Sequence, residues 1–144
     1  MGEIVWCKTL QEENFERGSK AGKRMVLLEP VWMANGKPQI NLDGSPSGRP
    51  SWEIGEKVVL YVGDGIRRFA ALVAIVSEPR VSTTADAHHP ADWPWATTAK
   101  VLRMMVDDGP TVDDAGVHYK MVQRRIRWHL DEPQSQKVLA AFGF

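Results

Sequence analysis

The aromatic residues with the most binding potential in this chain are its six tryptophans, against two tyrosines and four phenylalanines. Such large rings fill a core, and they also form stacking walls around a planar ligand. Trp128 alternates with Ile126 and Leu130 along a strand-like segment, which predicts a core position for its ring. Trp93 and Trp95 flank a proline that favours extended backbone, and two such large rings in one short segment are hard to bury together. We therefore expect at least one of them to meet a loop, a ligand or solvent.

Basic residues gather in three segments: Lys20 to Arg24, Arg67 with Arg68, and Lys120 to Arg127. Arginine and lysine bind phosphates and position nucleic acid without reading its sequence. The 18 basic residues are balanced by 18 acidic ones, so the chain lacks the surplus typical of non-specific binding. We expect a local patch in which the phosphate backbone is contacted by Arg67, Arg68, Arg124, Arg125 and Arg127.

Metal and nucleophile motifs are absent from the sequence. His88, His89 and Asp92 do not have zinc-ligand spacing, because adjacent side chains in a strand point to opposite faces. Cys7 follows Trp6 in an apolar segment, which favours a small buried side chain over a reactive thiolate. We expect no metal, no cofactor and no catalytic residue.

The length of 144 residues fits one domain, residues 1–144. The longest apolar run, Phe69 to Val76, is far shorter than the roughly 20 residues that span a bilayer. The first ten residues do not have the pattern of a signal peptide, and one cysteine forms no internal disulfide. We expect a cytoplasmic protein that does not enter a membrane; the oligomeric state stays open.

Most of the local signal is β. The segments that we expect as strands are Glu3–Trp6, Met25–Met33, Lys57–Val62, Phe69–Val76, Lys100–Val106 and Ile126–Leu130. Asp64-Gly65 is a tight-turn dipeptide, so the third and fourth of these form a hairpin. Both are apolar on both faces, which predicts a central position in the sheet.

Helices and loops occupy the remaining segments. Thr9 is expected to begin a short helix that continues to about Arg17, and Asp131 with Pro133 to begin a final helix that ends near Gly143. Asn35–Pro50 and Val81–Trp93 are expected as long loops. The fold class is therefore α+β, mainly β: a small, strongly curved sheet or barrel with two or three short helices.

Two segments resemble the PUA-like superfamily, whose strands carry similar patterns. They are Trp52-Glu-Ile-Gly55-Glu-Lys-Val58-Val-Leu-Tyr61 and Phe69-Ala-Ala-Leu-Val-Ala-Ile-Val-Ser77-Glu78-Pro79. Within the superfamily the EVE domain is the most similar, given the early Trp6 and a basic segment, Arg124 to Leu130, before the final helix. The Gly-x-Lys-x-x-Glu-x-Arg motif of the related ASCH domains is not found.

The resemblance implies a pseudo-barrel of about five or six strands that binds nucleic acid and reads a modified base, flipped between aromatic walls. The partner would be DNA rather than RNA. Trp6, Trp52 and Tyr61 match aromatic positions of the family. Loop position adds further candidates for the same ligand-binding pocket: Trp32, Asn35, Trp93 and Trp95.

Two other functions stay open. One is a small hydrolase or binding protein for a nucleoside-like ligand, for which Glu29, Asp64 and Cys7 are isolated candidates as acid, base or nucleophile. The other is a protein-interaction module anchored by Trp93 and Trp95. A shielded carboxylate beside a lysine or cysteine would favour the hydrolase, and a flat apolar patch the interaction module.

Overall fold

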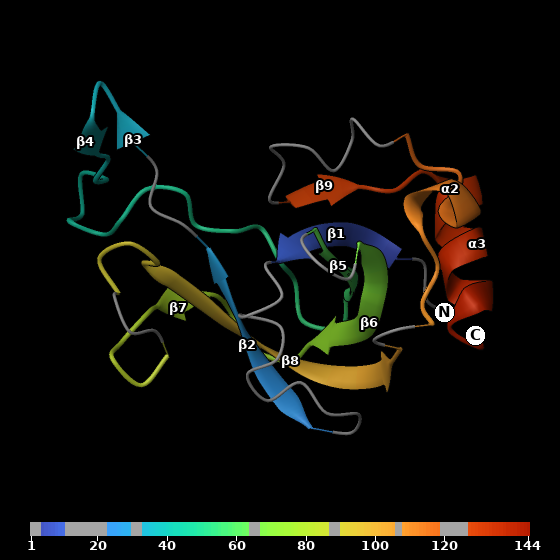
Figure 1. The fold of residues 1–144 in the computed structure, drawn as a ribbon. Helices are drawn as coiled ribbons and strands as arrows, with labels where there is room; N and C mark the ends of the chain where they lie inside the picture. Colours follow the sequence, from blue (N-terminus) through green and yellow to red (C-terminus); the bar gives the residue numbers. More distant parts are fainter. Residues whose placement is uncertain are drawn as a thin grey trace.

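The computed structural model describes residues 4–10, 23–29, 33–63, 67–86, 90–105, 108–118 and 127–144. Its elements, shown in Figure 1, are β1 (Ile4–Leu10), β2 (Arg24–Glu29), β3 (Met33–Ala34), β4 (Lys37–Pro38), β5 (Lys57–Val62), β6 (Arg68–Ile75), β7 (Arg80–Val81), β8 (Trp95–Met104), α2 (Val112–Ala115), β9 (Arg127–His129) and α3 (Glu132–Ala141).

One sheet organises the chain, with the strand order β2-β8-β6-β5-β1-β9 and with β7 beside β8. β5 and β6 form the antiparallel hairpin that the sequence predicts, and lie in the middle of this order. Residues 58–62 and 69–73 are buried on both faces, which explains their unbroken apolar pattern. β1 pairs with β5 in parallel, so the first strand of the chain lies next to the central hairpin.

The sheet is rolled up (Figure 1). One of its faces carries an apolar cluster to which β1, β2, β5, β6 and β8 all contribute, among them Leu10, Leu27, Leu60 and Val101. Because strands from both ends of the sheet share one cluster, this face must be the concave one. We call this cluster the inner core.

The opposite face is covered by the two helices. Val59, Tyr61, Phe69 and Leu72 pack there with Val138, Leu139 and Phe142 of the α3 region. Asp131 begins α3, accepting a hydrogen bond from the Gln134 amide in a capping box. This second cluster is the helix-side core.

Gly109 holds the segment before α2 against the sheet. The Phe69 amide donates to the Pro110 carbonyl at 2.9 Å, and Arg68 Nη1 donates to the Gly109 carbonyl at 2.8 Å. A Cβ at position 109 would lie 1.9 Å from the Phe69 carbonyl oxygen, so only glycine fits this approach. Arg68, expected to contact phosphates, therefore has a structural bond in the fold.

The fold class predicted from the sequence, a mainly-β curved sheet with short helices, is confirmed. Several boundaries differ. Thr9 lies in β1 and is not a helix cap, because Thr9 pairs with Tyr61 of β5. β8 begins at Trp95, five residues before the expected start, since its early part pairs with β2. The Asp64-Gly65 turn and residues 11–17 lie outside the described residues.

The short strands β3, β4 and β7 and the helix α2 were not expected. Asn35 and Gly36, both with positive φ, form the turn of a small β3–β4 hairpin at the start of the predicted long loop. Asp114 completes a capping box with Thr111 and so starts the short helix α2. In the part of the chain that the structure describes, no helix is long and apolar enough to span a membrane.

Phe142 and Phe144 give a matched test of the helix-side core. Phe142 is 1% exposed and Phe144 is 56% exposed. Phe142→Ala should therefore lower the free energy of unfolding by about 3–5 kcal/mol, through lost burial and the cavity left behind. Phe144→Ala should change it by less than about 1 kcal/mol. Urea unfolding measures both, and equal losses would contradict the packing of α3 described here.

Candidate functional site

A buried ion pair lies inside the roll of the sheet. Lys8 of β1 donates from Nζ to Glu29 Oε1 of β2 at 3.0 Å. Their side chains are 1% and 3% exposed. Removing two charges from water is costly, and their attraction offsets that cost only when geometry and further hydrogen bonds are good. A pair this deep is therefore a candidate for a function beyond stability.

The pair joins strands that are far apart in the sheet. β1 and β2 are separated by β5, β6 and β8 in the strand order. Lys8 and Glu29 can meet only because the sheet curls until its two ends face each other. We call Lys8 and Glu29 the inner ion pair. Lys8 shares its face of β1 with Trp6 and Leu10, which pack against the inner core, whereas Cys7 and Thr9 point to the other face. The inner ion pair therefore lies on the concave side.

A buried hydroxyl lies on the same face. Thr97 of β8 is directly opposite Leu27 of β2, which makes it a diagonal neighbour of Glu29. Thr97 is 0% exposed, and its Oγ1 has no hydrogen-bond partner among the described residues. A buried hydroxyl without a partner costs about 1–3 kcal/mol. Such a group is well suited to hydrogen-bond a ligand.

Two tryptophans are strand neighbours of the inner ion pair, and a third packs against one of them. Trp6 lies two residues before Lys8 on the same face of β1, and its ring meets that of Trp52 edge-on, with centroids 5.3 Å apart. His129 of β9 lies over Trp6 at 3.9 Å between centroids. Trp95 is directly opposite Glu29 in the β2–β8 pair. Trp6 is half-buried, whereas Trp52 and Trp95 are 2% and 6% exposed.

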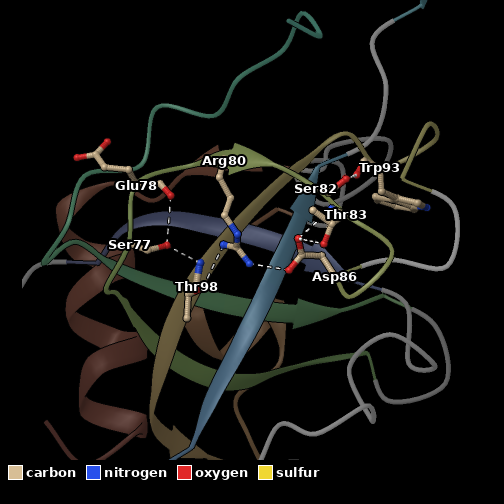
Figure 2. A network of polar contacts seen from close by, with 8 residues as sticks. All are labelled: Ser77, Glu78, Arg80, Ser82, Thr83, Asp86, Trp93 and Thr98. Atoms are coloured by element: carbon tan, nitrogen blue, oxygen red, sulfur yellow. Dashed lines mark hydrogen bonds and ion pairs between the residues drawn. The ribbon is translucent and has the colours of Figure 1, made fainter.

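The Trp93-Pro94-Trp95 segment is fixed by hydrogen bonds from two loops. Figure 2 shows the Ser82 hydroxyl donating to the Trp93 carbonyl, and the Ser82 amide donates to the Pro94 carbonyl at 2.8 Å. Trp95 Nε1 donates to the Pro46 carbonyl at 3.2 Å. The segment is therefore rigid, and Trp95 is held as the first residue of β8 instead of lying in a loop.

The other predicted site residues do not join this group. Tyr61 lies on the opposite face, in the helix-side core, with its ring against Phe69 at 5.2 Å. Asn35 is exposed in the β3–β4 turn, which projects away from the rolled sheet (Figure 1). Arg67 is exposed beside the β5–β6 hairpin. Trp32, Arg124 and Arg125 lie outside the described residues, and for Arg127 only the backbone, in β9, is described.

Cys7 is fully buried in the helix-side core. Burial raises the pKa of its thiol well above the ordinary value, because a thiolate there would be desolvated. The thiol therefore stays protonated near neutral pH and is a poor nucleophile. Of the candidates for acid, base or nucleophile that the structure describes, only Glu29 contacts the side chain of a lysine.

Sequence reasoning named Glu29 but missed Lys8 as its partner. A signal was present: Lys8 stands between Trp6 and Leu10 at the alternation of a strand whose inner face is apolar. The expected end of that strand at Trp6 removed Lys8 from consideration. Thr97 was missed because β8 was expected to begin only at Lys100.

No protein-family model and no curated protein matches this chain. Two solved structures are similar to it. Protein Atu2648 from Agrobacterium tumefaciens aligns over 96% of this chain and 92% of its own, with a TM-score of 0.50 and 13% identity. An ASCH protein from Zymomonas mobilis aligns over 95% and 94%, with a TM-score of 0.51 and 11% identity.

The rolled sheet with its helix-side cover is therefore the PUA-like fold, in the form that the ASCH protein has. At such low identity the similarity establishes the fold alone. The PUA-like fold predicted from the sequence is confirmed, whereas the structural neighbour that carries a domain name is an ASCH protein and not an EVE domain.

The inner ion pair can be tested by breaking it and by removing it. Lys8→Met leaves the Glu29 carboxylate buried without its ammonium and should cost about 3–5 kcal/mol of stability. Lys8→Met combined with Glu29→Leu removes both charges and should cost clearly less than Lys8→Met alone. Urea unfolding of Lys8→Met, of Glu29→Leu and of the double variant completes the double-mutant cycle and measures the coupling. Additive losses would show that the two side chains do not depend on each other.

Proposed function

We propose that this chain binds nucleic acid and accepts one modified base, turned out of its strand, at the inner ion pair. The observation that carries the proposal is the buried Lys8–Glu29 contact, flanked by aromatic rings on the concave face. The PUA-like fold supports it as an analogy. The proposal includes two finer points: the chain resembles EVE domains, and its partner is DNA and not RNA.

The polar groups at this position match the edge of a base. Lys8 is a donor, Glu29 an acceptor, and the Thr97 hydroxyl can serve as either. A base edge also presents donors and acceptors side by side. A site built around buried polar groups rejects a ligand that leaves them unpaired, often by several orders of magnitude. This supports selection of one base modification over ordinary bases.

The aromatic rings supply the stacking energy. Turning a base out of its strand costs a few kcal/mol, and stacking on one ring returns about 1–3 kcal/mol. Trp6 is half-buried and already ordered by Trp52 and His129, so little side-chain entropy is lost when a ligand binds. We assign Trp6 the stacking role and Trp52 and Trp95 the role of holding the inner face in shape.

The inner ion pair also favours a second function, hydrolysis of a substituent on a nucleoside-like ligand. A shielded carboxylate beside an ammonium is the arrangement that such an enzyme needs. Glu29 would take a proton from water as the water oxygen attacks a carbonyl carbon of the substituent. Lys8 would stabilise the negative charge on the carbonyl oxygen, and the leaving amine would then receive the proton.

Trp6→Leu tests base recognition. It keeps apolar volume but removes the stacking ring, so affinity for the selected modified base should fall by about 5- to 150-fold. The measurement is fluorescence anisotropy with DNA and RNA oligonucleotides that carry a panel of modified bases, against unmodified controls. Trp128→Leu is the matched control, since Trp128 is 3% exposed in the helix-side core. It should lower the melting temperature and leave base selectivity unchanged.

The proposal fails if no modified base is preferred by the parent protein, or if Trp6→Leu and Trp128→Leu change selectivity equally.

Glu29→Gln decides between binding and hydrolysis. If the chain is a hydrolase, incubation with modified nucleosides should release product that mass spectrometry detects, and Glu29→Gln should reduce the rate by about 100-fold or more because the base is lost. If the chain only binds, no nucleoside of the panel should change mass. Product formation unaffected by Glu29→Gln would contradict the assigned role of the carboxylate.

A further inference from the structure

Three cations form a row across the outside of the sheet. Arg24 of β2 is directly opposite Lys100 of β8, Lys100 is opposite Ala74 of β6, and Ala74 is opposite Lys57 of β5. Residues paired in this way share one face, so the three charged side chains follow one line at right angles to the strands. With strands about 4.8 Å apart, the line extends over roughly 14 Å. We call Arg24, Lys100 and Lys57 the basic row.

The basic row lies on the convex face, the side away from the inner ion pair. Lys57 alternates with Val58 along β5 and so shares its face with Val59 of the helix-side core. The helices do not cover this part of the face, because Arg24 and Lys100 are exposed. Phe144 lies at its border, with its ring centre 6.0 Å from Lys57 Nζ and 5.7 Å from Arg103 Cζ.

No described acidic side chain forms an ion pair with the basic row. Among the described residues, the ion pairs are Lys8–Glu29, Arg49–Glu78 and Arg80–Asp86, so none involves Arg24, Lys100, Lys57 or Arg103. Arg80 shows the contrast: Figure 2 shows its guanidinium between Thr98 and Asp86, 2.6 Å from the carboxylate.

Like charges directly opposite each other destabilise a sheet. The pairing of Arg24 with Lys100 therefore does not stabilise the isolated fold. An anion bound between the two side chains would relieve their repulsion.

We propose that the basic row holds the phosphate backbone of a nucleic-acid strand. This inference rests on the proposed function for the identity of the anion, and it adds a contact surface on the other side of the sheet from the base-reading site. An extended line of unpaired cations matches the regular charges of a single strand, and the exposed ring of Phe144 beside two cations adds a stacking position.

The test is the salt dependence of binding to an unmodified single-stranded oligonucleotide. Each phosphate contact contributes about 0.7 to the slope of log affinity against log salt. Arg24→Gln with Lys100→Gln should reduce the slope by about 1.4. Affinity should then fall about sevenfold less than in the parent protein between about 50 and about 200 mM salt. Lys37→Gln with Lys137→Gln is the matched control, because both lysines are exposed and the change in net charge is the same.

The outcomes separate this inference from the proposed function. A reduced slope in the Arg24/Lys100 variant alone supports the basic row, even if no modified base is preferred. Equal slopes in both double variants overturn the basic row, even if base selectivity through Trp6 is intact. Binding to vesicles with anionic lipids and not to oligonucleotides overturns it as well. The melting temperature of the Arg24/Lys100 variant should be unchanged or higher, since a like-charge pair is removed.

Discussion

The contact between Lys8 and Glu29 joins the two ends of the rolled sheet. The sheet has two ends, β2 on one side and β1 with β9 on the other, and right-handed twist alone does not bring such ends into register. An ion pair in a water-poor interior is sensitive to small displacements, because each charge left alone would be strongly destabilised. The pair therefore favours the closure of the sheet in which both charges meet, which is also the closure that places Trp6, Thr97 and Trp95 on the inner face.

The roll gives the two faces different chemistry. The helix-side face is closed by α3 and by Trp128, whose Nε1 donates to Thr9 Oγ1 at 3.3 Å. The described part of that core is apolar apart from such edge contacts. The inner face instead contains an ion pair and a hydroxyl amid apolar strands. Fully satisfied buried polar groups help to specify a structure, and under the proposed function the same residues would also meet the ligand.

Base recognition and backbone contact would then be carried by different surfaces. Phosphate contacts supply affinity and orientation, whereas specificity comes from groups that meet the edge of the base. A chain with balanced charge cannot rely on a general electrostatic surplus, so a short line of unpaired cations is an economical way to hold a strand. The inner face would then discriminate among bases.

The sequence by itself determined the central β5–β6 hairpin, the final helix and the mainly-β class, because each depends on local patterns: doubly apolar strands, a capping residue, a proline in the first turn. It also identified Trp6, Trp52 and Trp95 as candidates for a ligand-binding pocket. Only the tertiary structure decided that Tyr61 lies on the other face, and that Lys8 meets Glu29. These positions follow from strand order and from the curvature of the sheet. Both arise from pairings between segments distant in the chain, which local periodicity does not encode.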